Sequence, residues 1–316
     1  MEELSTFIST SHQLVSTTNS VCYISREGRL YYWDSNTPSE VSKLVVLPWP
    51  IQMVACSSRI NAVLTQSGEV YTLDNFQAPV LTLLNLPSVA TNVGINLSHV
   101  LVSTGTGELY KCHDSTVTLI DLPSACQEVF GHEWGVSFAL TVDGSLYAWG
   151  SDNEGALGVG LNAPQFIGTP TKVLIDEPVV GVSLAMKYTL ILTVSGRVYT
   201  CGFCRYLTDQ DEYTPVHIPF PSPCRLITSG NYHGFIGLKN GDLYAWGIGS
   251  VGEFGQFYRT YNTPTLLQID HKVASIACGS THSIMVSTDD RVYFTGLFIK
   301  DEHVRDVLTE FTAVVL

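Results

Sequence analysis

Apolar and polar residues alternate in short stretches along the whole chain, and no helical period of three to four residues separates these stretches. A two-residue alternation of this kind is typical of half-buried β-strands. One pattern recurs: an alternating apolar run, a small polar residue, a turn with Gly, and a second run that ends in Tyr. Residues 62–71 (AVLTQSGEVY) and 235–244 (FIGLKNGDLY) are two copies. Because the turn separates two strand-like runs, each copy predicts a β-hairpin.

Seven copies of this hairpin pattern fill the chain, the seventh with Asp290 in place of the turn glycine, and their final tyrosines lie 37 to 52 residues apart. These tyrosines are Tyr31, Tyr71, Tyr110, Tyr147, Tyr199, Tyr244 and Tyr293. A further apolar strand precedes each hairpin, as in 179–186, and a Pro-flanked one follows it, as in 169–175. Four short strands in each of seven units predict an all-β, seven-bladed β-propeller that forms one domain over residues 1–316.

The ends of the chain bear on how such a ring closes. The first unit is complete from about Gln13, and an apolar strand at 311–316 follows the seventh hairpin. We therefore expect the N- and C-terminal strands to share one blade and to close the ring, which would pin both termini. Ring closure also protects the exposed edges of the sheets.

Composition limits the function classes. The chain has 16 basic and 29 acidic residues, and its formal net charge is −13. A charge of this sign repels a phosphate backbone, so we expect no binding of nucleic acid. Charged residues make up only 14% of the chain and hydrophobic residues 45%, and no polar linker interrupts it. These proportions exclude a disordered protein and favour one large folded unit.

Nothing in the sequence predicts insertion into a membrane. The first ten residues are acidic and lack the basic and apolar regions of a signal peptide, and Pro48 and Pro50 interrupt the most apolar stretch, 43–56. We expect a cytoplasmic protein. No basic cluster for nuclear targeting is visible, so the sequence does not separate the cytoplasm from the nucleus. The eight cysteines are interpreted as small buried residues in a reducing compartment rather than as a disulfide framework.

Two units carry a resemblance to a known family. Residues 136–158 (VSFALTVDGSLYAWGSDNEGALG) and 234–255 (GFIGLKNGDLYAWGIGSVGEFG) resemble the repeats of the regulator of chromosome condensation family. The resemblance implies a propeller whose loops on one face hold protein partners. Its members include the nucleotide exchange factor for the small GTPase Ran. The histidine column of the family repeat is retained at His99, His233 and His282 only.

The candidates for chemistry are weak. Residues 247–252 match a dinucleotide-binding fingerprint, but Gly255 and Pro264 argue against the helix that would hold a pyrophosphate. Cys201 and Cys204 lack the second pair that a zinc site needs. The three column histidines have no nucleophile or carboxylate that recurs beside them. We therefore predict no catalytic residue, no cofactor and no metal, and we do not expect an enzyme.

Two long loops are the best candidates for contact with a partner. The first, 254–261, concentrates aromatic rings and an arginine, which are enriched at binding hot spots. The second, 206–213, offers three carboxylates that would suit a basic surface or a cation. The alternatives are that half of the rings pack beneath the first loop and that the second is simply solvated. The predicted contact residues are Phe257, Tyr258, Arg259, Tyr261, Asp209, Asp211 and Glu212.

The sequence thus predicts a non-enzymatic interaction scaffold that docks a protein partner on one propeller face. The alternative is a guanine nucleotide exchange factor or another regulator of a small GTPase, which the family resemblance alone supports. A third reading is a recognition subunit of a ubiquitin-ligase or trafficking assembly. In each case the partner is a protein, whether a small GTPase or a subunit of a larger complex.

Overall fold

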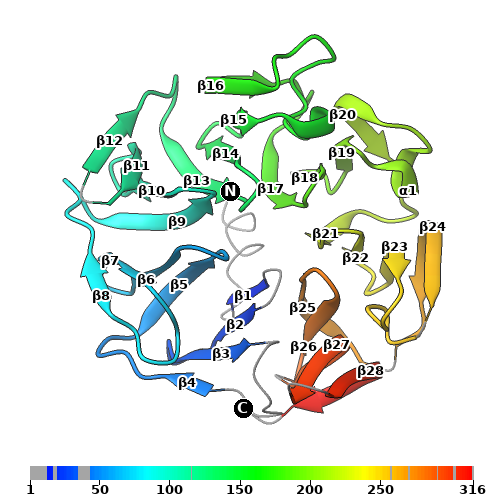
Figure 1. Ribbon diagram of the computed structural model, residues 1–316. Helices are drawn as coiled ribbons and strands as arrows, with labels where there is room; N and C mark the ends of the chain where they lie inside the picture. Colours follow the sequence, from blue (N-terminus) through cyan, green and yellow to red (C-terminus); the bar gives the residue numbers. More distant parts are fainter. Residues whose placement is uncertain are drawn as a thin grey trace.

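Seven antiparallel sheets of four strands surround a common axis like the blades of a propeller (Figure 1). The computed structural model describes residues 13–16, 20–34, 43–114, 116–256, 258–269, 271–289, 291–301 and 304–314. The all-β, seven-bladed architecture expected from the sequence is confirmed. In the described part of the chain, helical structure is limited to α1 (Arg205–Thr208) and the 3-10 turn η2 (Asn153–Gly155).

Each blade uses four strands that are consecutive in the sequence, from the innermost to the outermost. Blades 1 and 2 contain β1 (Gln13–Ser16), β2 (Ser20–Ile24), β3 (Leu30–Asp34), β4 (Lys43–Val45), β5 (Ile51–Cys56), β6 (Asn61–Thr65), β7 (Val70–Leu73) and β8 (Leu81–Leu83). Blades 3 and 4 contain β9 (Ala90–Asn96), β10 (His99–Thr104), β11 (Leu109–His113), β12 (Thr116–Ile120), β13 (Cys126–Gly131), β14 (Val136–Thr141), β15 (Leu146–Ser151) and β16 (Phe166–Val173). Blades 5 and 6 contain β17 (Val179–Leu184), β18 (Tyr188–Thr193), β19 (Val198–Gly202), β20 (Glu212–Ile218), β21 (Cys224–Ser229), β22 (His233–Leu238), β23 (Leu243–Gly249) and β24 (Arg259–Leu267). Blade 7 contains β25 (Val273–Cys278), β26 (His282–Ser287), β27 (Val292–Asp301) and β28 (Val304–Val314).

The two ends of the chain lie in different blades, so the expectation that they share one is wrong. Strand β1 pairs with β2 in blade 1, and β28 pairs with β27 in blade 7. Each of these blades already has four strands from its own stretch of sequence, and neither needs one from the other terminus. The ring closes instead by packing, since β1 contacts β25 across the seam.

Burial explains the apolar runs of the repeat. The second strand of blades 3 to 7 is buried at every position, because a neighbouring blade covers each of its two sides. The outermost strands β16 and β24 have mostly exposed or half-exposed positions, which matches their threonines and prolines. The core is therefore a series of layers between blades rather than one central mass.

The repeated tyrosine packs against the connection that enters its own blade. Tyr71 stacks on Trp49 with 4.5 Å between ring centroids, and Tyr293 stacks on His271 at 4.4 Å. The Tyr199 hydroxyl donates a hydrogen bond of 2.7 Å to Asp176. In blades 2, 5 and 7 this tyrosine thus attaches the blade to the segment that links it to the preceding one.

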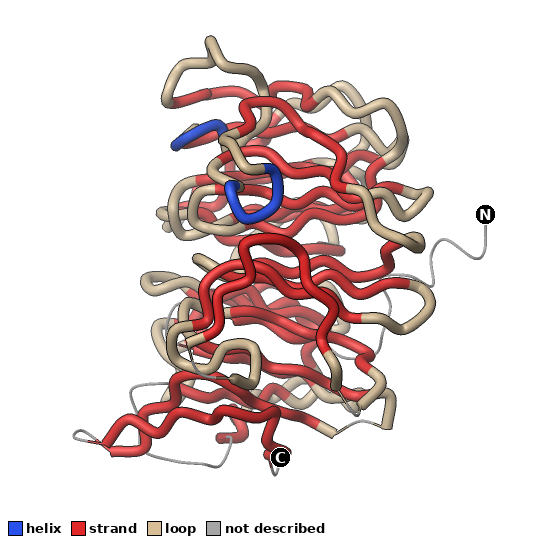
Figure 2. Tube along the Cα trace, turned by 90° about the vertical axis from the view of Figure 1, so that its right-hand side faces the viewer, coloured by secondary structure: helices blue, strands red, loops and turns tan. Residues whose placement is uncertain are grey.

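The connections divide the ring into two faces. In an antiparallel blade, the first-to-second and third-to-fourth connections lie at one end of the strands, and the hairpin turns and blade-to-blade links lie at the other. We call the first end the loop face and the second the turn face. Both α1 and η2 belong to the loop face, where they lie on one side of the ring (Figure 2). No helix among the described residues is long and apolar enough to span a membrane.

Candidate docking face

Two loops of the loop face clamp the next blade. In the loop after β15, the Ala156 carbonyl accepts a hydrogen bond of 2.7 Å from the Thr189 hydroxyl of blade 5. In the loop after β23, the Glu253 carbonyl accepts one of 2.9 Å from the Ser283 hydroxyl of blade 7. The apolar residue that follows each carbonyl, Leu157 or Phe254, is buried. These parts of the loops fix blade to blade, so they cannot meet a partner.

The dinucleotide-like fingerprint lies in the second of these clamps. Gly252 and Gly255 have positive φ angles of 96° and 77°, like Gly155 and Gly158 in the loop of blade 4. The strand β24, not a helix, follows the fingerprint. These glycines therefore allow the tight turns of this loop.

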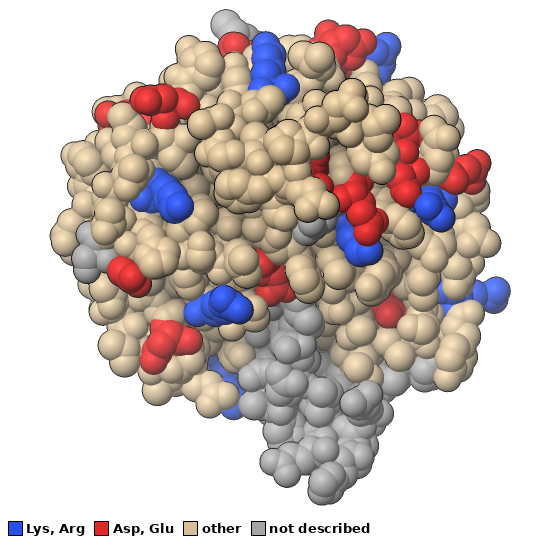
Figure 3. Space-filling view, turned by 45° about the horizontal axis from the view of Figure 1, so that its top comes forward, with Lys and Arg blue, Asp and Glu red and all other residues tan. Residues whose placement is uncertain are grey.

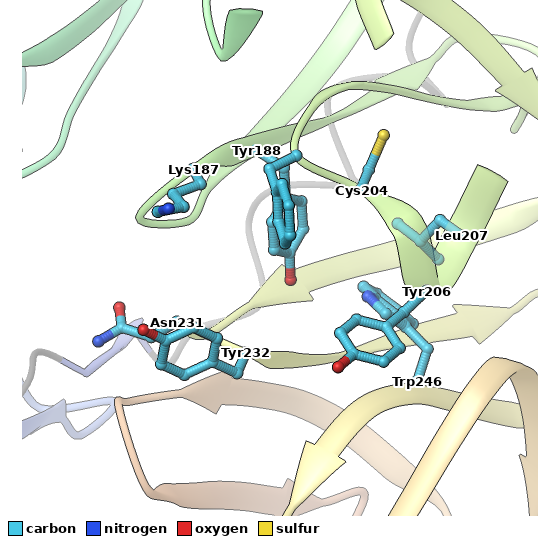
Figure 4. Close-up of a pocket in the computed structure, with 9 residues that line it drawn as sticks. Lys187, Tyr188, Cys204, Tyr206, Leu207, Asn231, Tyr232 and Trp246 are labelled. Atoms are coloured by element: carbon cyan, nitrogen blue, oxygen red, sulfur yellow. The ribbon is translucent and has the colours of Figure 1, made fainter. Parts of the chain in front are cut away.

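The loop after β19 covers a pocket between blades 5 and 6. The helix α1 lies in this loop and contacts β23 and β24 of blade 6. The pocket has an empty volume of about 360 Å³, including its open mouth, and mostly aromatic side chains line it. The rings of Tyr206 and Tyr232 stand on either side of it, and the Tyr188 hydroxyl points between them (Figure 4). Trp246 lies behind Tyr206 and is 1% exposed.

The exposed aromatic rings gather on the loop face. Among the described residues, five aromatic side chains are at least about one third exposed, and all lie in loop-face connections or in strand ends beside them. They are Trp134, Phe166, Tyr213, Tyr232 and Tyr258. They belong to blades 4, 5 and 6. The large exposed side chains of the turn face, such as Val142 and Leu174, are aliphatic.

The predicted aromatic loop divides between core and surface. Tyr258 is 83% exposed and has a positive φ of 49°, so its ring stands out from the loop. Arg259 is also exposed, and its Nε donates a hydrogen bond of 2.8 Å to Gln256. Tyr261 is half-buried against Phe254, with 5.0 Å between ring centroids. Phe257 lies outside the described residues.

The predicted acidic loop adjoins α1, and part of it is paired. Asp211 accepts two hydrogen bonds, of 3.1 and 2.9 Å, from the Arg205 guanidinium. Glu212 accepts one of 2.8 Å from Gln210. Asp209 is exposed and ends α1 in a left-handed conformation. Because α1 also contacts β24, the fold brings this loop close to the strand that begins at Arg259.

Charges on this part of the loop face are mixed, with an acidic excess. Lys187 forms an ion pair of 2.7 Å with Glu154, and the charged groups of Lys187 and Arg205 lie 5.3 and 5.1 Å from the centroid of the Phe203 ring. Both cations are thus matched to carboxylates, whereas Asp209 adds a further negative charge. Figure 3 shows acidic side chains gathered toward the upper right, with fewer basic ones between them.

The three column histidines are structural. His233 is fully buried, and its Nε2 lies 3.0 Å from the Ser283 hydroxyl. Since that hydroxyl donates its proton to the Glu253 backbone carbonyl, His233 must donate its Nε2 proton to the serine. The neutral imidazole of His233 is therefore the Nε2-protonated tautomer. Burial lowers the pKa of His233 to about 3 and those of His99 and His282 to about 4. These rings remain neutral. His233 links blade 6 to blade 7, whereas His99 contacts the adjacent Ser98 and His282 stacks on Phe294 of its own blade.

The cysteines and possible metal ligands form no site of the kind weighed from the sequence. The Cys201 thiol donates to the Ala156 carbonyl and that of Cys204 to the Gly202 carbonyl, so the two thiols are directed to different partners. Within the part of the chain that the structure describes, no three side chains of His, Cys, Asp or Glu come together as metal ligands.

Sequence reasoning missed three side chains of this face. Trp134, Lys187 and Tyr232 each lie in a short loop between the first and second strands of a blade. They directly precede, or lie two residues before, the histidine column of their unit. This position could have revealed them, because a residue just before the histidine column lies at the loop end of the second strand. The prediction considered only the long loops between the third and fourth strands.

The fold and its repeats define the class of this protein. The model of the regulator of chromosome condensation (RCC1) repeat matches residues 143–192 and 240–286, which belong to blades 4 to 7. Together with the seven four-stranded blades, these repeats make the chain a β-propeller of repeat type. Over these segments it is similar to the RCC1-like repeat family.

Relatives share parts of the sequence. The chain is 27% identical to the human E3 ubiquitin-protein ligase HERC2 in an alignment of 264 positions that covers 76% of this chain and 5% of that protein. It is 28% identical to the Xenopus laevis regulator of chromosome condensation over 184 residues, covering 50% of this chain and 43% of that protein. The chain thus spans only a minor part of the relatives it matches.

Solved structures share the fold. Human WBSCR16 superimposes with a TM-score of 0.76 at 16% identity, over 88% of this chain and 85% of that one. Yeast RCC1 (Prp20), solved with Kap60 bound, gives a TM-score of 0.74 at 16% identity, over 88% and 81% of the two chains. At such low sequence identities the similarity supports a shared propeller fold and nothing more specific.

Proposed function

We propose that the protein is a non-enzymatic interaction scaffold whose loop face, over blades 4 to 6, docks a protein partner. The observation that carries this proposal is the gathering of exposed aromatic rings on that face, with Arg259 beside Tyr258. Tyrosine, tryptophan and arginine dominate the energetics of protein interfaces. The shallow pocket between Tyr206 and Tyr232 adds further aromatic surface to this face.

Charge defines the partner further. The net charge of the protein is −13, and the cations nearest the pocket are already paired with carboxylates. A basic partner surface would gain from Asp209, Asp211 and Glu212, and like charges would repel an acidic one. We therefore expect a partner segment with an apolar residue flanked by Lys or Arg.

The test uses single truncations on the face. The partner is captured from native cells with the tagged protein, and the affinities of Tyr258→Ala, Arg259→Ala and Tyr232→Ala are then compared with that of wild type. Each substitution at a central contact should weaken binding by about 2 kcal/mol, or about 30-fold, with an unchanged melting temperature. Val142→Ala is the matched control, because Val142 is an exposed apolar residue of the turn face.

The opposite results are equally informative. If all three loop-face variants bind with wild-type affinity, this face is not the interface. If a variant binds poorly because its melting temperature falls, the side chain belongs to the core. Should Val142→Ala alone weaken binding, the turn face holds the partner.

A second candidate is regulation of a small GTPase. It is supported by the similarity to the Xenopus regulator of chromosome condensation and by the fold shared with yeast Prp20, whose solved structures include a study of its binding to Gsp1p and histones. A release assay with fluorescent guanine nucleotide and a panel of small GTPases separates this function from passive docking. Accelerated release that Tyr258→Ala abolishes would support it, and no acceleration with any GTPase would exclude it for that panel.

A role as the recognition part of a ubiquitin-ligase assembly rests on the similarity to HERC2, of which this chain covers 5%. In that case the propeller would bind the protein that is to be ubiquitinated. Copurification of ubiquitin-ligase subunits, lost together with partner binding in Tyr258→Ala, would distinguish it from a free scaffold.

A further inference from the structure

Two cysteine thiols from neighbouring blades face each other. Cys22 lies in the middle of β2 in blade 1, and Cys56 is the last residue of β5 in blade 2. Their sulfur atoms are 3.4 Å apart. A disulfide bond is about 2.05 Å long, so the sulfurs must approach by only about 1.4 Å. Both thiols are free in the structure.

The pair arises where two units of the repeat differ from the others. Cys278 ends β25 as Cys56 ends β5, but the residue that corresponds to Cys22 in the preceding blade is Phe235. Cys278 and Phe235 lie in one apolar cluster, which is the ordinary filling of this layer between blades. In blades 1 and 2 the same layer instead places two thiols in contact.

The two thiols differ in access to solvent. Cys22 is fully buried, and desolvation followed by the neighbouring Cys56 raises its pKa well above the usual range. Cys56 is only partly buried, at the edge of the loop face beside the connection at 57–60. A dissolved oxidant therefore reaches the Cys56 thiol first. The buried Cys22 thiol lies within reach of the oxidised Cys56 sulfur.

We propose that Cys22 and Cys56 are a redox-sensitive pair that peroxide converts into a disulfide linking blade 1 to blade 2. In the first step, the Cys56 sulfur attacks hydrogen peroxide, the O–O bond breaks, and a sulfenic acid and water form. In the second, the Cys22 sulfur attacks the Cys56 sulfur, the S–O bond breaks, and a second water leaves with the proton of Cys22. Two thiols are oxidised by one peroxide, which is reduced to two waters.

The link would join the first blade of the ring to the second. Blade 1 meets blade 7 at the seam, where no strand pairing joins the described end segments 13–16 and 304–314. A disulfide between blades 1 and 2 ties the seam blade covalently to its other neighbour. Because it closes a loop of more than thirty residues, it should raise the melting temperature by roughly 3–8 °C.

The experiment is a titration of the fully reduced protein with hydrogen peroxide. Remaining thiols are alkylated, intact mass is measured, and peptides are mapped without reduction. We expect the loss of two hydrogen atoms, one cross-linked peptide containing Cys22 and Cys56, a higher melting temperature, and reversal of all three by dithiothreitol. Cys22→Ala and Cys56→Ser should each abolish the cross-link, and Cys278→Ala should keep it.

Two results would overturn the proposal. One is addition of oxygen to Cys56 in the folded wild type without a cross-link to Cys22. The other is a cross-link that persists in Cys56→Ser or that joins different cysteines. If Cys22→Ala fails to fold, Cys56→Ser provides the same test, because Cys56 is partly exposed and serine is tolerated at such a position. These measurements need no partner, so their outcome is independent of the proposed docking function.

Discussion

At the scale of single residues, the molecule contains buried groups whose protonation opposes folding. His233 is fully buried, and desolvation followed by repulsion from His282 lowers its pKa to about 3. In an unfolded chain the same imidazole has a pKa of about 6.5. The unfolded state therefore binds more protons than the folded state between these values. It follows that stability is lost as the pH falls below about 6.5.

We predict that His233→Gln reduces the pH dependence of folding. Glutamine can still donate to Ser283 but does not titrate, so the difference in unfolding free energy between about pH 7 and about pH 5 should shrink by about 2 kcal/mol. Urea unfolding at both pH values measures this. Glu128, whose pKa burial raises to about 7, acts in the opposite sense but is common to both proteins.

The control is His217→Gln, since His217 is exposed on β20. It should leave the difference between the two pH values as in wild type. Equal pH dependence of His233→Gln and wild type would mean that the buried ring is protonated without penalty, contrary to its position in the core.

At the scale of elements, two glycines of blade 6 show why a blade requires glycine at particular positions. Gly247 and Gly241 belong to the same blade and have nearly equal φ angles of 97° and 100°. A Cβ on Gly247 would overlap the Tyr232 carbonyl oxygen, whereas a Cβ on Gly241 would meet nothing within 4 Å. The two positions thus separate steric conflict from backbone strain.

We predict that Gly247→Ala destabilises the protein far more than Gly241→Ala. The strain of a positive φ should cost each variant about 1–3 kcal/mol, and the overlap with the backbone of β22 should add about 2 kcal/mol or more to Gly247→Ala alone. Denaturant midpoints of the two variants measure the difference. If both variants lose the same stability, the close approach of Gly247 to Tyr232 does not constrain the blade.

At the scale of the whole molecule, the acidic balance governs which polymers the propeller can bind. The 16 basic residues are outnumbered by 29 acidic ones, and several exposed cations are paired within the fold, such as Lys187 with Glu154. Binding of a nucleic acid draws its free energy from counterion release by clustered Lys and Arg.

We predict that the protein forms no complex with duplex DNA in a gel shift near physiological salt. The same assay with a basic DNA-binding domain of similar size serves as the positive control. A complex that weakens as salt is raised would contradict the prediction and would point to a basic surface within the ring.

The sequence by itself determined the strands, the hairpin turns and the number of blades, because these depend on residues within about ten positions of one another. The alternation of 62–71 and the turn glycine Gly68 are enough to define a hairpin. The prediction that the terminal strands share one blade was wrong, because the way in which opposite ends of the sequence meet leaves no local signal. Tertiary structure alone decided that Phe254 is core and Tyr258 surface, and that Cys22 meets Cys56. Burial in a propeller is set by the neighbouring blade, and that blade lies tens of residues away in the sequence.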